Sequence, residues 1–410
     1  MFSFPRLVLF QINLTTKSLT VELTRFFNRI DYNIEENSYT KQSYSEARMK
    51  MKHEAYIELN EDLVREYYTG DVYKKYKGYR LIAIDGSRIG LPNKEELVRE
   101  FGLAENKGKS VPMAMSSTAY DVLNNIAINS YLERYETSER ELAERHISKI
   151  KGLTGDETKD ILIMDRGYPS MYLFAKMIVN GFDFVVRCNA SGFLNEVKEV
   201  EKNNMTDSII EIDLTAERWK YKQGIQELTG TGGIKSIKLR LVRIILETGT
   251  TEYIITSVLD KAITVEDFKE IYHLRWNEEV YFNCLKNIIE VENFSGRTPE
   301  TIRQDYYARV LSGNISSLII EEAQEEIDKE TSGKPNQKYA KYKINKSVAI
   351  GILKDEVIEM LLAPKDISEK MYQVMVKTIK KHKIPIIPGR SFERKLKIGN
   401  RFFLKRRKVI

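Results

Sequence analysis

Short apolar runs in the first half of the chain predict a set of buried strands. LIAID ends at Asp85 and ILIMD ends at Asp165, and both runs are followed by Gly and Pro. Apolar runs of this length bounded by Gly and Pro are typical of buried strands. Between them, VPMAMSSTAYD and NNIAINSYLER predict two antiparallel strands joined near residues 122–125. The pattern therefore predicts a sheet with an aspartate at the end of two of its strands.

Helical periodicity alternates with these strands. SERELAERHISKIK predicts a helix capped by Ser138, and SMYLFAKMIVN predicts another helix before the strand FDFVVRC. The order βββαβαβ, with early antiparallel and later parallel strands, fits an α/β, ribonuclease H-like mixed sheet flanked by helices. Such a sheet places Asp85 on its first strand and Asp165 on its fourth, which are neighbours. An aspartate at the carboxyl end of such a strand faces the crevice in which open α/β sheets bind ligands.

The remaining segments predict four further regions around the first part of this core, which spans 78–190. Residues 1–77 are predicted to be helical, and alternating polar and apolar positions over 191–260 predict an inserted antiparallel β subdomain. Residues 261–325 complete the core with a long helix over 298–325. Residues 326–410 are predicted to be a polar linker and two amphipathic helices that form a helical, basic C-terminal region.

Four residues near the two-thirds point of the chain predict a site that binds metal ions and phosphates. Tyr272, Arg275, Glu279 and Lys286 are spaced by 3, 4 and 7 residues, which returns to one face of a helix or of two helices in series. A carboxylate suits a metal ion, and the two cations suit phosphates. With Asp85 and Asp165 this makes three carboxylates. Three carboxylates suit a pair of Mg²⁺ ions, which clamp the oxygens of an in-line displacement at phosphorus.

Composition narrows the class of protein. The 410 residues hold 65 Lys and Arg against 59 Asp and Glu, a net charge of +6, and 42% of residues are hydrophobic, as in a folded protein. Residues 377–410 hold thirteen Lys or Arg and one acid, Glu393. This tail suits a DNA backbone, although a solubilising end is the alternative. Cys188 and Cys284 lie outside any CxxC motif, which indicates a reducing cytoplasm.

The chain offers no expected membrane segment. No run of 18 apolar residues is present, and Pro5 and Arg6 interrupt the apolar start, which therefore does not predict a signal peptide.

The basic cluster at Lys41, Arg48, Lys50 and Lys52 predicts either a DNA-contacting helix or a solvated basic face.

Three motifs in order resemble a known family. DGSRIGLP, DRGYPS and the Y-x2-R-x3-E-x6-K signature are similar to the bacterial DDE transposases of the insertion-sequence-four family, and ENFSGRTPETIRQDYYA resembles the segment after that signature. The resemblance covers roughly residues 35–325. It implies that Asp85, Asp165 and Glu279 are catalytic and bind two Mg²⁺ ions, with Mn²⁺ also compatible.

The resemblance also implies the partners and the reaction. We expect cut-and-paste transposition of an insertion sequence through a hairpin intermediate and strand transfer in a bacterial, nucleoid-associated setting. The expected partners are double-stranded DNA, as terminal inverted repeats and target, and a second copy of the chain that dimerises on the DNA ends. Residues 1–77 are expected to bind those ends. This region is short for the family, so we also expect that the start is truncated or that end recognition is incomplete.

Several further residues are expected to contact the DNA. Tyr272, Arg275 and Lys286 are expected to hold phosphates, and Arg166 and Tyr168 to contact DNA. Trp219 lies among Arg218, Lys220 and Lys222, a setting that suits stacking on an unpaired base or, alternatively, packing within the inserted sheet. Trp276 and Phe282 are expected to pack their helix onto the sheet.

Two other functions stay open. A nuclease of the same fold without strand transfer would cut DNA and never join ends. A transposase-derived protein that only binds DNA has no use for three carboxylates facing phosphates, since their repulsion weakens binding unless a metal ion intervenes.

Overall fold

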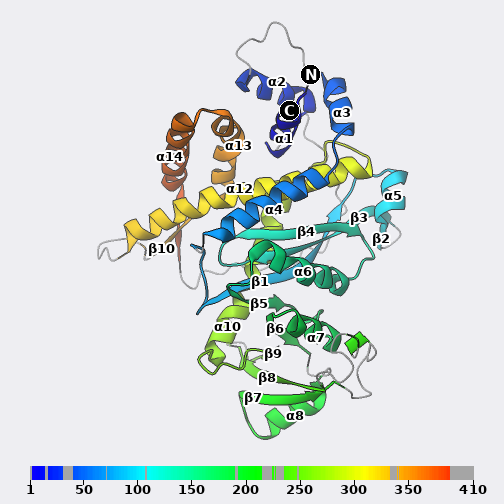
Figure 1. Ribbon diagram of the computed structural model, residues 1–410, viewed down its shortest axis with the longest axis vertical. Helices are drawn as coiled ribbons and strands as arrows, with labels where there is room; N and C mark the ends of the chain where they lie inside the picture. Colours follow the sequence, from blue (N-terminus) through cyan, green and yellow to red (C-terminus); the bar gives the residue numbers. More distant parts are fainter. Residues whose placement is uncertain are drawn as a thin grey trace. The chain divides into compact units, whose positions relative to one another are not determined.

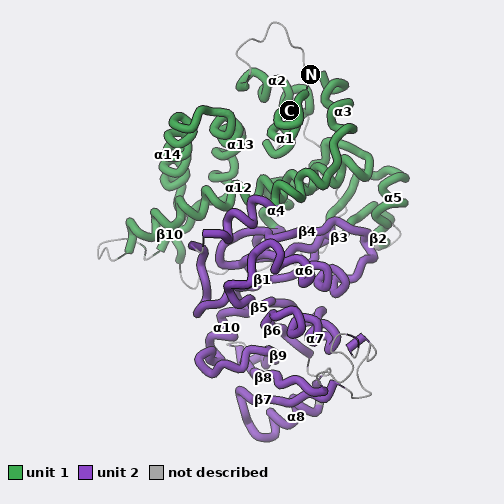
Figure 2. The backbone as a smooth tube through the Cα atoms, viewed as in Figure 1, with its two compact units in different colours: residues 1–60, 89–114, 283–410 green, residues 61–88, 115–282 purple. Residues whose placement is uncertain are grey.

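The computed structural model describes most of the chain. The described residues are 2–13, 17–30, 40–70, 72–106, 109–189, 193–214, 224–225, 227, 235–246, 249–332, 339 and 341–387. Trp219 and most of the basic tail lie outside them. The chain forms two compact units built from segments that are far apart in the sequence (Figure 2). Unit 1 contains residues 1–60, 89–114 and 283–410, and unit 2 contains residues 61–88 and 115–282.

A nine-stranded sheet has the strand order β2-β3-β1-β5-β6-β9-β8-β7, and β4 pairs with β3. The strands predicted from the first apolar runs are β1 (Tyr79–Gly90), β3 (Lys109–Asp121), β4 (Ile126–Arg134), β5 (Lys159–Met164) and β6 (Asp183–Cys188). β5 runs parallel to both β1 and β6. The order β4-β3-β1-β5-β6, with a parallel centre, is ribonuclease H-like and confirms the predicted fold class.

The central strands form the core of unit 2. The segments Leu81–Ile84 and Ile161–Met164 are completely buried. Parallel strands with both faces covered need no polar alternation, which explains their continuous apolar runs. Helices α6 (Glu139–Thr154), α7 (Met171–Val179) and α10 (Val265–Leu274) pack on these strands: α6 on β4, α7 on β6, and α10 on β6 and β8 (Figure 1).

The predicted inserted region continues the core sheet. It contains α8 (Leu194–Lys202), β7 (Asp207–Asp213), β8 (Ser236–Ile245) and β9 (Thr251–Thr256). These strands are antiparallel to one another, as predicted. However, β9 also pairs with β6, from Val185↔Thr256 to Cys188↔Tyr253. The insertion therefore extends the sheet beyond β6.

Unit 1 begins with α1 (Phe4–Ile12), α2 (Leu19–Ile30) and α3 (Lys41–Met49), which pack through edge-to-face aromatic contacts such as Phe10 with Phe26 and with Tyr44. Thr40 caps α3, because its side chain accepts the N–H of Ser43. α3 ends at Met49, and α4 (Glu54–Thr69) begins after a short break.

Arg48, near the end of α3, explains part of the basic cluster. Its buried guanidinium donates to Gln304 at 2.6 Å and to Asp305 at 2.7 Å. Arg48 is thus a core residue of unit 1, whereas Lys41, Lys50 and Lys52 are exposed. A DNA-contacting face on α3 has to be made without Arg48.

The long helix α12 (Pro299–Thr331) is the centre of unit 1. It packs against α1, α13 (Lys346–Leu362), α14 (Lys365–Lys381) and β10 (Lys341–Ile344) (Figure 1). The sequence patterns did not predict α5 (Glu95–Phe101), β2 (Leu103–Asn106) or the two strands β10 and β11 (Lys383–Ile386), which pair with each other. The strands β10 and β11 are short and Lys-rich, so their sequences contain no apolar run that would signal a strand.

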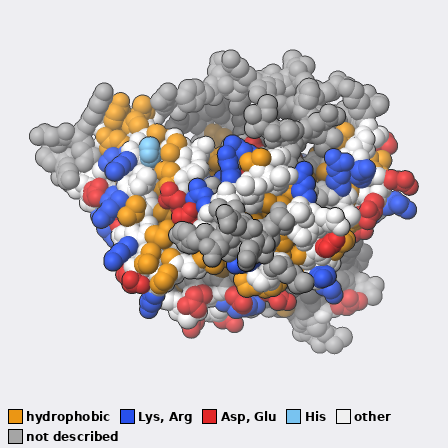
Figure 3. Space-filling view, turned by 90° about the horizontal axis from the view of Figure 1, so that it is seen from above, with side chains coloured by type: hydrophobic (Ala, Val, Ile, Leu, Met, Phe, Trp, Pro, Cys, Tyr) orange, Lys and Arg blue, Asp and Glu red, His pale blue; other side chains and the backbone are white. Residues whose placement is uncertain are grey.

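Basic and acidic side chains are interspersed on the face drawn in Figure 3, together with hydrophobic ones. Among the described helices, none is long and apolar enough to cross a membrane.

A buried histidine on α6 makes the stability of unit 2 depend on pH. His146 is fully buried; its Nε2 lies 3.0 Å from Ser117 Oγ, and its Nδ1 contacts Asn129. Burial, assisted by Lys149, lowers the pKa of His146 to about 3. Because protonation is easier in the unfolded chain, this contribution is complete above pH 6.5 and is lost as the pH falls from 6.5 towards 3.

We expect acidification from pH 7.5 to pH 5 to lower the free energy of unfolding by about 2 kcal/mol through His146 alone. The measurement is urea unfolding at both pH values for the wild type and for His146→Gln, which keeps an amide able to hydrogen bond with Asn129 and Ser117. The glutamine variant should lose less stability between the two pH values. An equal loss in both proteins would contradict the assignment.

Candidate active site

Parallel pairing of β1 and β5 brings two aspartates to the same end of the sheet. The last paired residues are Ala83 and Ile163, and Asp85 and Asp165 each follow two positions later. Asp85 Oδ1 accepts the N–H of Gly86 at 2.8 Å, and Asp165 Oδ1 accepts the N–H of Gly167 at 2.6 Å. The turn after β5 therefore holds Asp165, whereas Asp85 is held by the next residue of β1, which continues to Gly90 and does not end at Asp85 as predicted.

The signature residues lie on two helices in series. Tyr272 is on α10, Arg275 caps the end of α10, and α11 (Trp276–Asn287) carries Glu279. Arg275 Nη1 donates to Asp85 at 3.2 Å and Nη2 donates to Glu279 at 2.8 Å. The Arg275 side chain is 9% exposed. A single guanidinium thus joins Asp85 on β1 to Glu279 on α11.

A second glutamate, Glu278, holds the backbone of Asp85 through a hydrogen bond. Glu278 is fully buried, and its Oε1 accepts the backbone N–H of Asp85 at 2.9 Å. Its Oε2 is buried without a hydrogen-bond partner. Burial raises the pKa of Glu278 well above its ordinary value, and the nearby charge of Asp85 adds to this. The neutral acid is therefore the favoured form of Glu278.

A fifth acidic side chain, Glu139 in the first turn of α6, lies near the two aspartates. A Cβ atom on Gly86 would stand 2.8 Å from Glu139 Oε1, so the carboxylate of Glu139 lies close to the backbone of Gly86. A Cβ atom on Gly167 would stand 3.0 Å from Asp165 Oδ1 and 3.9 Å from Glu139 Oε2. Burial raises the pKa of Asp85 to about 6, with Asp165 and Glu139 adding to it against the Gly86 N–H and Arg275.

Sequence reasoning missed Glu139 and Glu278. An acidic residue in the first turn of a helix is ordinarily explained by the helix dipole, so Glu139 gave no separate signal. Glu278 directly precedes Glu279 in the sequence. Which of the two accepts the backbone N–H of Asp85 depends on how α11 packs against β1.

A pocket of about 620 Å³ adjoins the signature residues. It is lined by Tyr272, Arg275 and Trp276, and also by Arg187, Lys269 and His273 among others. Trp276 is 40% exposed, which corrects its expected packing on the sheet, whereas Phe282 is buried as expected. Burial raises the pKa of Tyr272, against Arg275 and Arg187, which lower it. Glu252, Glu266 and Glu270 also line the pocket, which thus combines charges of both signs with an exposed aromatic ring.

The structure places the other predicted residues differently. Arg166 is exposed beside Asp165. Tyr168 is completely buried, and the expected DNA contact does not fit this burial. Lys286 lies in the last turn of α11, and burial lowers its pKa although nearby Glu292 favours the charged form. Trp219 lies outside the described residues.

Comparison with known families decides the class of protein. The model of the transposase DDE domain matches residues 76–315, more than half of the chain. The chain belongs to the transposase DDE domain family. Membership makes it a transposase, a nucleic-acid-cleaving enzyme that depends on divalent metal ions. Asp85, Asp165 and Glu279 all lie within the matched residues.

One solved structure shows a remote similarity. A cryo-EM structure of the piggyBac transposase synaptic complex with hairpin DNA aligns over 94% of this chain and 76% of that chain, with a TM-score of 0.43 and 12% sequence identity. No curated protein matches the chain significantly.

The donor set fits the metal ions of this transposase family. Asp85, Asp165 and Glu139 offer only carboxylate oxygens, which suit hard divalent cations, and their mutual repulsion favours a bound cation. The three ligands expected from the sequence, Asp85, Asp165 and Glu279, do not meet closely in this conformation. Among the described residues, donor atoms of three side chains gather within 4.8 Å only at His53, Glu54 and Glu300. Arg275, which lies between Asp85 and Glu279, accounts for their separation.

Replacing Glu278 tests its neutral form. We expect Glu278→Gln to change the free energy of unfolding by less than about 1 kcal/mol, because the amide oxygen still accepts the Asp85 N–H and the NH₂ takes the place of the protonated oxygen. Glu278→Ala should cost about 2–4 kcal/mol through a cavity and an unpaired N–H. Urea unfolding measures both. A glutamine variant as unstable as the alanine variant would mean that the charge of Glu278 is required.

Cation binding has a readout without DNA. At a Mg²⁺ concentration ten times its Kd, we expect the wild type to gain about 1.4 kcal/mol of stability, because the cation relieves repulsion among the carboxylates. Thermal unfolding with and without Mg²⁺ measures this gain. Asp165→Asn should lose most of it, whereas Glu199→Gln, an exposed change on α8, should keep it. An equal gain in Asp165→Asn would place the cation elsewhere.

Proposed function

We propose that this transposase performs cut-and-paste transposition as a member of the insertion-sequence-four group, with Asp85, Asp165 and Glu279 as its catalytic carboxylates. The observation that carries the proposal is the bridge from Asp85 through Arg275 to Glu279, on a β1–β5 pairing that sets Asp165 beside Asp85. Asp85 is half-buried and linked on one side to Glu279 and on the other to the strand that precedes Asp165, and phosphodiester chemistry with divalent ions requires such carboxylates to converge on the cations.

Mg²⁺ is the cation we propose, with Asp85, Asp165 and Glu279 as ligands. When bound, two such ions supply an activated water or 3′-hydroxyl and stabilise the leaving oxygen. The chain itself contributes orientation. Glu278 fixes the backbone of Asp85, and Arg275 holds Glu279 in place. The backbone N–H groups of Gly86 and Gly167 hold the two aspartate side chains. Glu139, across from Asp85 and Asp165, adds negative charge that strengthens cation binding.

We propose that the signature cations hold the DNA near this centre. The guanidinium of Arg275 is planar and can pair with phosphate in place of a carboxylate, and Lys286 offers a point charge. Arg166 is exposed and available to a phosphate. The pocket beside Tyr272 and Trp276 has the volume and the stacking surface that an unpaired nucleotide needs. Trp219 remains a proposal from the sequence.

The partners we propose are the terminal inverted repeats, the target DNA and a second copy of the chain on paired ends. Residues 1–77 are proposed to bind the ends through exposed lysines such as Lys41, Lys50 and Lys52. The tail over 377–410, with thirteen basic residues and one acid, is proposed to add salt-dependent affinity for DNA.

The test is cleavage of a labelled DNA fragment that carries the element's own end. We expect the wild type to cut at the end in the presence of Mg²⁺ and to join the freed 3′ end to target DNA. Glu279→Gln should slow cutting by roughly 1000-fold while it still binds the end, because metal-assisted stabilisation is worth several kcal/mol. The same change at the exposed Glu199, Glu199→Gln, is the matched control and should cut normally.

The other outcomes are informative in different ways. Cutting without joining would identify a nuclease and exclude strand transfer. Binding to the end without cutting in the wild type would identify a DNA-binding descendant. Cutting that Glu279→Gln leaves unchanged would remove Glu279 from the catalytic set.

A further inference from the structure

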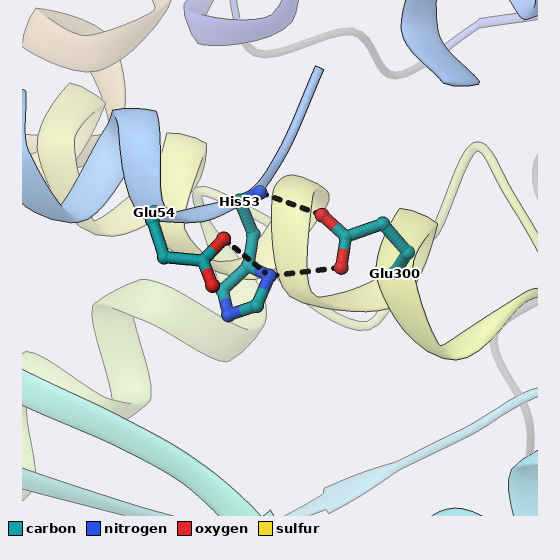
Figure 4. Close-up of side chains that lie close together, drawn as sticks. All are labelled: His53, Glu54 and Glu300. Carbon is teal, nitrogen blue, oxygen red and sulfur yellow. Dashed lines mark hydrogen bonds and ion pairs between the residues drawn. The ribbon is translucent and has the colours of Figure 1, made fainter. Parts of the chain in front are cut away.

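The starts of α4 and α12, in unit 1, bring together three side chains that bind metal ions in other proteins (Figure 4). His53 precedes α4, Glu54 is its first residue, and Glu300 lies in the first turn of α12. His53 Nδ1 is 3.3 Å from Glu54 Oε2 and 2.9 Å from Glu300 Oε2. The three ligand atoms lie within 4.8 Å of one another.

Two of these side chains are held in place by contacts outside the group or by the backbone. The ring of His53 stacks on Tyr307, with centroids 5.7 Å apart and an interplanar angle of 15°. Glu300 Oε1 accepts the backbone N–H of His53 at 2.6 Å, which turns Oε2 towards the ring (Figure 4). The imidazole and this carboxylate are therefore oriented before a ligand arrives, and preorganisation favours binding.

An ion pair alone explains the geometry less well. Both carboxylates approach the same nitrogen, Nδ1 (Figure 4). That atom carries at most one proton, and the proton points well towards one oxygen only. A cation between the three atoms satisfies all of them. Tetrahedral Zn²⁺, with bonds of about 2.0–2.1 Å, holds its ligand atoms about 3.3 Å apart, close to the two separations observed.

We propose that His53, Glu54 and Glu300 form a binding site for a divalent transition ion of the Zn²⁺ type, separate from the carboxylates around Asp85. An imidazole ligand suits zinc and related ions, whereas Mg²⁺ prefers oxygen alone. Three protein ligands leave one coordination position for water. The ion ties the start of α4 to the start of α12, beside the buried pair of Arg48 and Asp305. It is a tether within unit 1 and does not depend on the catalytic assignment.

Metal titration of the full chain tests the site. We expect metal-free protein in excess Mg²⁺, which occupies sites made of oxygen ligands, to bind about one Zn²⁺ per chain. Co²⁺ in its place should show the visible absorption of a tetrahedral complex. His53→Gln and Glu54→Gln should each abolish this stoichiometric binding and the Co²⁺ spectrum. The exposed Glu54 tolerates replacement, so its variant remains informative if His53→Gln does not fold.

Two controls separate this site from other carboxylates. Glu58→Gln makes the same change as Glu54→Gln one turn further along α4, on an exposed side chain, and should bind Zn²⁺ as the wild type does. Asp165→Asn should also keep the Zn²⁺. The proposal is overturned if the wild type binds no Zn²⁺ in excess Mg²⁺, if Glu54→Gln binds it unchanged, or if Asp165→Asn loses it.

Discussion

The contact of one guanidinium with two carboxylates is the interaction on which the proposed active site depends. Asp85 belongs to a strand with a completely buried core, whereas Glu279 belongs to a helix that begins just after Arg275. Arg275 connects the two because it stands at the junction of α10 and α11, where the chain changes helix. In its absence, Asp85 and Glu279 would lose the cation that both carboxylates share. The same fork geometry can release a carboxylate in exchange for a phosphate.

Much of this arrangement could be predicted from the sequence, because it rests on local patterns. The apolar runs that end at Asp85 and Asp165 identified two neighbouring strands, and 3.6-residue periodicity placed Glu279 one turn after Arg275. The proximity of Glu139 could not be predicted, since it depends on how α6 packs on the sheet. Neither could the fate of Arg48 and Tyr168: each occurs in a polar segment typical of the surface, yet both are buried by contacts from distant parts of the chain.

The carboxylates around Asp85 illustrate how burial and function are coupled. Glu278 is fully buried and Asp85 is half-buried, and burial raises the pKa of both carboxyl groups, which favours their neutral forms. A folded protein accepts such a cost where the charges serve a bound cation, and perturbed carboxylates gather at functional sites for that reason. Gly86 and Gly167 lie against the side chains of Glu139 and Asp165, so a larger residue at either position would make these acids shift.

The pairing of β6 with β9 has a consequence for the synthesis of the chain. β6 ends at Cys188, and its partner begins at Thr251. A ribosome adds residues at about 5–20 per second, so the edge of β6 stays without its partner for roughly 3–13 seconds after it emerges. An unpaired edge of a hydrophobic strand is a template for aggregation. The insertion thus covers this edge of the nascent sheet only after that interval.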